Sequence, residues 1–350
     1  PSTEPAPTTF ADPEEKTLKT TQADTTTTPA AEEPSTALED VTVEKAYKPK
    51  DPTSTPSSNW ISVVNDWVGE AAKELKIRLS NVNIKKTSND DTAPMTVDGS
   101  GNTTIELDGN NVLDAHDESG INRTHAAGLE KKGTGTLTIT DTGSITAEDG
   151  TTQDNKRRGS LTATGSWGPS GGAGIGSRGN VGATSVTIEN ITIEGNAYVK
   201  AYGQGNASGI GGGYKGNAKN IIIKDNAYVV AKGGCAGIGS GCYGGSSDVK
   251  IQDGTVVAEG YYTGIGGHYM DSDTSGTTET STIEISGGTV YAKGDGSTTS
   301  GDGVSIGSTG RNSNITISGD AKVKNTGRMG SHASYDVKDK GISSTIIIKD

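Results

Sequence analysis

A short glycine-bracketed stretch recurs in the second half of the chain, and its periodicity restricts the folds open to the sequence. Four copies have a small residue, then Gly-Ile-Gly, then Ser or Gly, and a fifth copy is looser: residues 173–177, 208–212, 236–240, 263–267 and 304–308. Repetition about every 30 residues is typical of a solenoid, because one repeat cannot bury its apolar face alone.

Two strand-like runs accompany each copy. In the first run Ile or Val occupies alternate positions, and six such runs end at residues 193, 223, 251, 285, 317 and 348. Runs at 82–84, 105–107 and 137–139 match it, and 127–129 resembles a degenerate glycine stretch. In the second run a Val is followed two positions later by Ala or Asn, as in Val199 and Ala201. Because side chains alternate along a strand, each such pair shares the inner face.

These three elements predict an all-β fold, a single-stranded parallel β-helix (a solenoid) of about nine coils. The glycine stretch would form a third side of each coil, with its Ile pointing inward and its Gly residues allowing a corner. Successive coils would pair as parallel strands about 4.8 Å apart. The parallel crossovers predict a right-handed helix.

The composition suits such a thin core. Among 350 residues there are 52 Gly, one Phe and only 30% hydrophobic residues, which is little for a compact globular core. The net charge of -12 argues against nucleic acid as a partner. No apolar run in the sequence has the length that membrane insertion needs, so we expect no membrane insertion.

Three segments differ in character. Residues 1–58 are rich in Thr, Pro, Ala, Glu and Ser, and we expect a disordered tether. Residues 59–76 predict an N-terminal cap, and helix-like spacing of Trp60, Val64 and Trp67 favours a helix, although 61–64 could equally be a strand. Residues 77–350 would form the β-helix, with a loop at 148–158. Since the sequence stops just after a strand run, we expect truncation at the C-terminus and other domains of a longer chain.

The repeat also carries a resemblance to a known group of proteins. The pattern T-I-x-I, G-G-T-V-x-A-x-G and A-G-I-G-S/G is similar to Gly-rich secreted and surface proteins of anaerobic Gram-positive bacteria, described as carbohydrate-binding-domain β-helix proteins. A calcium-binding, polysaccharide-binding β-helix of cellulolytic clostridia and the β-solenoid regions of some lactobacillus adhesins look similar. The resemblance covers about residues 77–350. It implies a secreted or cell-surface location and a polysaccharide or host or plant glycan as ligand.

Outward positions of the second run mix Tyr with Lys in columns across the coils. Aromatic rings stack on the apolar face of a sugar, and Lys can meet a uronate carboxylate. The predicted carbohydrate-binding residues on this face are Tyr198, Lys200, Tyr202, Tyr228, Lys232, Tyr291 and Lys293. The same residue types also suit exposed strand positions without any ligand.

A second row of aromatic residues follows the glycine stretches. Tyr214, Tyr243 and Tyr269 lie four or five positions after the Ile of three copies. They could line a groove at the coil corners and bind carbohydrate there. Alternatively, each Tyr only covers its own glycine-rich loop.

Two acidic patterns are candidates for structural calcium. Asp271 and Asp273, followed by Ser275, Gly276 and Glu279, resemble the start of a calcium loop, but the twelfth position is Thr282. Asp225 and Asp253 align on neighbouring coils, where a cation would relieve the repulsion between their carboxylates. Either pattern could be only a solvated turn.

The two cysteines flank one glycine stretch. Cys235 and Cys242 could form a disulfide, depending on their Cα separation. The four histidines, at positions 116, 125, 268 and 332, are scattered and predict surface groups rather than a Cys-His metal site. The sequence has no nucleophile elbow, P-loop or zinc-protease motif.

These observations favour a non-catalytic carbohydrate-binding or adhesive module. A structural spacer is the alternative, because regular coils fit it equally well. A polysaccharide lyase-like enzyme is less favoured, since such a site needs clustered carboxylates holding calcium and a basic proton acceptor, and no Arg aligns with Asp225 and Asp253.

Overall fold

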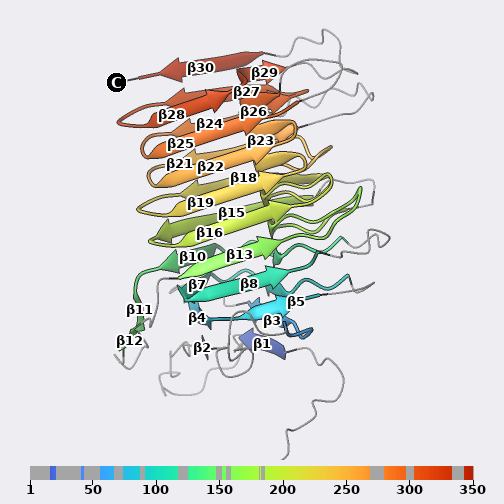
Figure 1. Cartoon of the computed structure of the whole chain (residues 1–350), viewed down its shortest axis with the longest axis vertical. Helices are drawn as coiled ribbons and strands as arrows, with labels where there is room; N and C mark the ends of the chain where they lie inside the picture. The colour runs from blue at the N-terminus through green and yellow to red at the C-terminus, as the bar shows by residue number, and fades with distance from the viewer. Residues whose placement is uncertain are drawn as a thin grey trace, which may run out of the picture.

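Each repeat of the sequence forms one coil of a parallel β-helix in the computed structural model (Figure 1). The structure describes residues 16–20, 41–42, 56–66, 74–86, 91–116, 125–146, 152–154, 159–180, 182, 186–268, 280–296, 303–332 and 343–349. Every regular element in these residues is a strand, so the predicted all-β solenoid is confirmed.

Three parallel sheets run along the solenoid, and each takes one strand from successive coils. Sheet A contains the glycine stretches: β1 Lys16–Thr20, β3 Ile61–Asn65, β6 Met95–Asp98, β9 Leu129–Lys131, β14 Ile175–Gly176, β17 Ile210–Gly211, β20 Ala236–Gly239, β23 Thr263–His268, β26 Val304–Thr309 and β29 Arg328–His332. Sheet B contains the first runs: β2 Val41–Thr42, β4 Leu75–Ser80, β7 Thr103–Asp108, β10 Leu137–Asp141, β15 Val186–Gly195, β18 Gly216–Ile223, β21 Ser247–Ile251, β24 Thr280–Ile285, β27 Asn312–Ile317 and β30 Ser344–Ile348.

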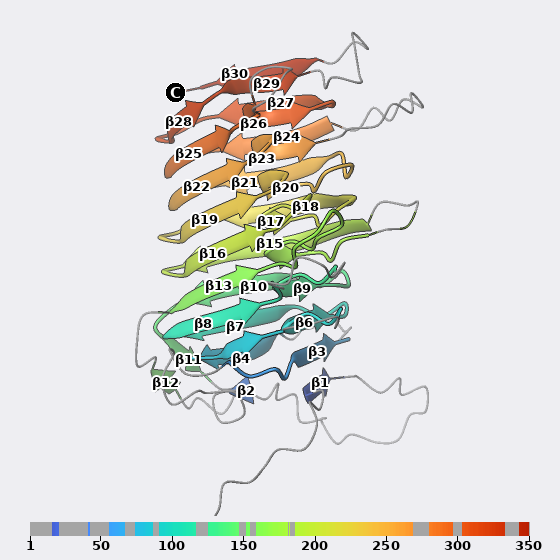
Figure 2. The same cartoon turned by 45° about the vertical axis from the view of Figure 1, so that its right-hand side comes forward.

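Sheet C contains the second runs: β5 Asn83–Lys85, β8 Asn110–Asp114, β13 Ser160–Thr164, β16 Tyr198–Gly203, β19 Tyr228–Gly233, β22 Thr255–Gly260, β25 Thr289–Gly294 and β28 Lys322–Thr326. Figure 2 shows these strands stacked one above another along one side of the solenoid. A short antiparallel hairpin, β11 Ser144–Thr146 with β12 Thr152–Asp154, leaves the coil that contains β10 and β13.

Counted over the described residues, the coils agree with the predicted number. The strands pass through sheets A, B and C in turn from β3, β4 and β5 to β26, β27 and β28, which makes eight coils, and β29 and β30 begin a ninth. The two strands β1 and β2 lie inside the predicted tether and pair with β3 and β4. The remainder of residues 1–55 lies outside the described residues, so the tether stays a prediction.

The core is a narrow column of stacked aliphatic side chains. In sheet B, Ile191 pairs with Ile221 and Ile193 with Ile223, and all four side chains are fully buried. In sheet C, Val199 and Ala201 pair with Val229 and Ala231 and are also buried. Fully burying each Ile or Val stabilises the fold by about 1.5–3 kcal/mol, so the repeated ladder supplies the main driving force.

The glycines of the repeat allow a close backbone approach, both to sheet C and to the next strand of sheet A. The first Gly of one copy, Gly237, lies so near sheet C that an added Cβ would stand 2.6 Å from the backbone nitrogen of Glu259. The second, Gly239, has a φ of +138° and faces the Gly266 carbonyl oxygen, which a Cβ would approach to 2.0 Å. The Ile between them, Ile238, is fully buried as predicted. A side chain at either glycine would therefore block the stacking of coils.

Two predictions near the N-terminus are wrong in detail. Residues 61–65 form strand β3, as the strand alternative predicted, and not the favoured helix. Residues 67–73 lie outside the described part of the chain. The run at 82–84 contributes to β5 in sheet C, whereas β4 supplies the sheet B strand of that coil. By contrast, the degenerate copy at 127–129 does pair with a glycine stretch, through Leu129 and Ile175.

No helix within the described residues has the length and apolar character that crossing a membrane requires.

Candidate functional site

The outer face of sheet C carries the predicted Tyr and Lys columns in direct register. Tyr198 lies opposite Tyr228, Lys200 opposite Val230, and Tyr202 opposite Lys232. Two strands further on, Tyr291 continues the middle column and Lys293 continues the column of Tyr202. The alternation places these side chains outward because Val199, Ala201 and their partners occupy the inner face.

Two tyrosines and one lysine of this face form a contact group. The Tyr198 and Tyr228 ring centroids lie 5.1 Å apart at an interplanar angle of 72°, in an edge-to-face arrangement. The Lys200 ammonium lies 5.0 Å from the Tyr198 ring centroid, within cation–π range. Tyr228 is 37% and Tyr291 43% exposed, so both offer aromatic surface to solvent.

The lysines at the edge of this face are already paired. Lys232 lies 2.9 Å from the Glu259 carboxylate, and Lys293 lies 2.7 Å from that of Asp295. The hydrogen bond to Asp295 raises the pKa of Lys293, so its ammonium stays charged at neutral pH. All four side chains are well exposed, so solvent screens both pairs and they contribute little to stability. An anionic ligand could therefore exchange with these carboxylates at little cost.

Two members of the predicted corner row lie together. The Tyr214 and Tyr243 ring centroids are 5.5 Å apart, and the Lys215 ammonium lies 5.5 Å from the Tyr214 ring. Tyr269, the third member, lies outside the described residues.

Two further tyrosines, which the sequence analysis did not predict as site residues, lie near this corner row. Tyr261 and Tyr262 contact each other at 4.8 Å, and Tyr262 lies 3.9 Å from the His268 ring. Burial raises the pKa of Tyr262, with further contributions from Tyr261 and Tyr243, so the Tyr262 hydroxyl stays protonated at neutral pH. The sequence signal that could have identified them is the pair of consecutive tyrosines directly after strand β22 of sheet C.

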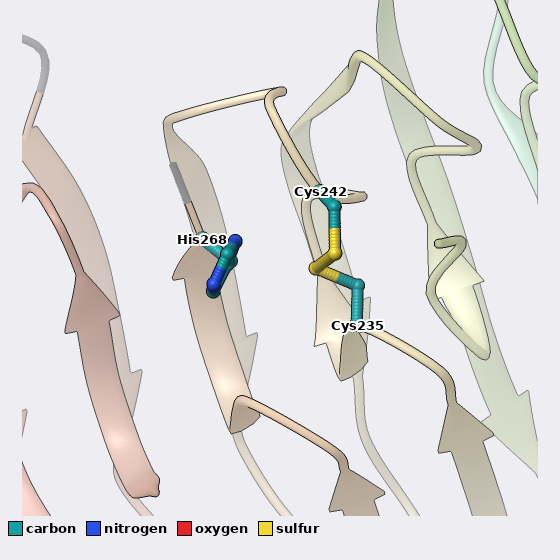
Figure 3. A group of neighbouring side chains, drawn as sticks. All are labelled: Cys235, Cys242 and His268. Atoms are coloured by element: carbon teal, nitrogen blue, oxygen red, sulfur yellow. A yellow bond between two sulfur atoms is a disulfide. The ribbon is translucent and has the colours of Figure 1, made fainter. Parts of the chain in front are cut away.

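The cysteines that flank β20 form a disulfide, with their Cα atoms 5.5 Å apart (Figure 3). His268, at the end of β23, lies beside it. The sequence predicted that His268 lies on the surface. This prediction is wrong, because His268 is only 1% exposed. Burial lowers the pKa of His268 to about 3, so the imidazole is neutral at physiological pH.

The residues predicted to bind calcium are only partly described. Asp271 and Asp273 lie outside the described residues. Asp225 and Asp253 are exposed, and each carboxylate accepts a backbone N–H, from Gly195 at 3.1 Å and from Gly254 at 2.7 Å respectively. Within the described ranges, neither belongs to a group of three or more side chains that could hold a metal ion together.

A charged cluster lies where β9 and β14 pair in sheet A. Arg178 and His125 both contact the Asp91 carboxylate, and the Lys132 ammonium lies 3.5 Å from Glu130. Burial raises the pKa of Glu130, while Lys132 and Arg178 oppose that shift. Each carboxylate here is matched by a cation, which is the arrangement of a structural ion-pair network.

A polar groove of about 280 Å³ crosses sheet B on the outer side of β18, β21 and β24. Its lining is Lys219, Ser246, Ser247, Asp248, Lys250, Thr280, Thr282 and Glu284. Lys250 and Glu284 lie 3.8 Å apart, so the groove is charged but internally balanced and has no exposed ring for a sugar.

Comparison with protein-family models, with curated proteins and with solved structures found no match to this chain.

Proposed function

We propose that this chain is a non-catalytic carbohydrate-binding or adhesive module of a secreted or cell-surface protein, and that a polysaccharide lies along the outer face of sheet C. The observation that carries the proposal is the register of Tyr198, Lys200 and Tyr228, with the exposed ring of Tyr291 two strands away. A long ligand parallel to the solenoid axis would meet one residue of each column about every 4.8 Å.

The chemistry of the face suits a sugar chain better than a nucleic acid partner. Rings of Tyr228 and Tyr291 offer flat apolar surface, and the intervening Val230 and Val257 are only half-buried. Lysines beside the rings favour an acidic polysaccharide, such as a polyuronate, over a neutral one. The overall charge of -12 disfavours nucleic acid.

A structural spacer is the alternative, since a regular solenoid can hold another domain at a distance without binding anything. Calcium enters the proposal only as a structural ion at Asp225 and Asp253 or at Asp271 and Asp273. A lyase-like activity is the third possibility, and the paired charges around Glu130 do not favour it.

The test is binding of the full chain to immobilised polygalacturonate, cellulose, xylan and mucin, with calcium and with a chelator. We expect saturable binding to at least one class, strongest for an acidic polymer and weaker as salt rises, because the lysine contribution is screened. Absence of binding to all four would favour the spacer. Release of ultraviolet-absorbing unsaturated products from polygalacturonate would contradict a non-catalytic role.

A further inference from the structure

Three side chains with metal-binding chemistry converge at the ends of the sheet A strands β20 and β23. The ligand atoms of Cys235, Cys242 and His268 all lie within 4.8 Å of one another, and all three residues are buried. Figure 3 shows the imidazole on β23 beside the disulfide that flanks β20. The strands β20 and β23 are neighbours in the same sheet, so the coil register creates this group.

Both nitrogens of the His268 imidazole are available to bind a ligand. Among the described residues, neither Nδ1 nor Nε2 of His268 has a hydrogen-bond partner, although the residue is 1% exposed. Buried polar atoms in folded proteins are almost always satisfied, and an exception calls for a bound ion or similar explanation. The backbone N–H of His268 donates a 3.0 Å hydrogen bond to the Ser240 hydroxyl, which fixes the point from which the imidazole projects.

We propose that, once the disulfide is reduced, Cys235, Cys242 and His268 bind a borderline-soft divalent cation of the Zn²⁺ type. Reduction by a dithiol transfers two electrons and two protons to the disulfide, giving two thiols, while the dithiol becomes a disulfide. The cation then displaces the two thiol protons to solvent and bonds to both thiolates and to one imidazole nitrogen. Water completes a tetrahedral set.

The backbone can keep this geometry in both redox states. Cys235 donates its N–H to the Ala207 carbonyl at 3.0 Å, and Cys242 donates to that of Asn206 at 2.9 Å. These bonds to the preceding coil do not involve the sulfurs. Zinc–ligand bonds of about 2.0–2.3 Å imply ligand-to-ligand separations of about 3.5–3.8 Å, which side-chain rotation can reach from the present arrangement.

The donor set also separates this site from the calcium predictions. Two thiolates and an imidazole suit zinc or another late first-row ion, whereas calcium requires oxygen ligands. Thiolates are needed for binding, so the site would exist only under reducing conditions and would report the redox state of the surroundings.

The test uses the full chain and Co²⁺ as the probe, under anaerobic conditions. The reduced protein should bind one Co²⁺ with a thiolate-to-cobalt charge-transfer band, and Zn²⁺ should displace it; the oxidised protein should bind none. H268F should weaken binding by about tenfold or more, whereas His332→Phe, on β29, should not.

A reduced wild-type protein without the charge-transfer band would overturn the proposal. So would an H268F variant with wild-type affinity. Far-ultraviolet circular dichroism establishes that each variant is folded, and if H268F is not, the comparison of oxidised with reduced wild-type protein still decides the question.

Discussion

At the scale of single residues, the second glycine of the repeat sets the shape of each coil. Gly176, Gly211, Gly239, Gly266 and Gly307 all have φ values between +123° and +143°. L side chains rarely adopt this conformation, and the space for a Cβ is taken by the carbonyl of the next coil. Each copy of the repeat therefore has a backbone conformation at this position that requires glycine.

We predict that Gly239→Ala destabilises the protein. The variant combines an unfavourable φ with a backbone contact at 2.0 Å, so we expect a loss of at least about 2 kcal/mol in the free energy of unfolding. Denaturant unfolding measures it. The control is Gly182→Ala, where a Cβ would meet only the Asn180 side chain at 3.0 Å. Equal stability of the two variants would contradict this account of the repeat.

The buried His268 predicts a pH dependence of stability. Its pKa is about 3 in the folded protein, against an ordinary value of 6.5. The unfolded chain therefore takes up a proton below pH 6.5 that the folded protein excludes, and stability falls as the pH drops from 6.5 towards 3. Between pH 7.5 and 5.0, the oxidised, metal-free wild type should lose about 2 kcal/mol more than H268F.

Denaturant unfolding of both proteins at the two pH values isolates this contribution, because the carboxylates are common to both. An identical loss of stability in wild type and H268F would mean that the imidazole titrates normally in the folded state.

At the scale of elements, alternation predicted sheet C well because each strand has one buried and one exposed face. The pattern of Tyr198 to Gly203 alternates between half-buried and buried residues, and its neighbours repeat it. The helix favoured within residues 59–76 does not form at Ile61–Asn65, because this run alternates with period two and its first four residues pair with β6 in sheet A. Tertiary pairing overrode a weak local preference there.

The group of Cys235, Cys242 and His268 could not be predicted from cysteine spacing alone, because its histidine comes from the next coil. Register supplies the missing signal: Gly239 pairs with Gly266, so His268 follows this pair on one coil just as Cys242 follows it on the other. Alignment of the copies would have placed the imidazole there. Its burial and its unpartnered nitrogens depend on side-chain packing, which periodicity does not encode.

The disulfide should stabilise the coil that contains β20. It closes a loop with a sequence separation of 7, for which the chain-entropy estimate is about 2–3 kcal/mol. We therefore expect the double variant Cys235→Ala and Cys242→Ala to lose roughly that free energy of unfolding relative to the oxidised protein. Chelator-treated, reduced wild type is the matched comparison and should behave like the variant. If the double variant and the reduced wild type are both as stable as the oxidised protein, the disulfide does not stabilise the fold.

At the scale of the whole molecule, the solenoid presents three long surfaces of different chemistry. Sheet A is narrow and glycine-rich, sheet B has a charge-balanced groove, and sheet C offers aromatic rings beside lysines. Because columns continue from coil to coil, a surface feature on one strand becomes a track along the axis (Figure 2). A linear polymer is the ligand that can use such a track.

The most direct test of the central claim compares three proteins on the same polysaccharide panel: wild type, the double variant Tyr198→Ala and Tyr228→Ala, and Ile222→Ala. Ile222 is a half-buried, outward residue of β18 in sheet B, so its loss controls for the removal of outward apolar surface. At roughly 1 kcal/mol per ring, the double variant should bind about 30-fold more weakly, with Ile222→Ala unchanged and all three equally folded. Equal affinity of wild type and double variant, or no binding by wild type, would contradict the claim that sheet C is a polysaccharide-binding face.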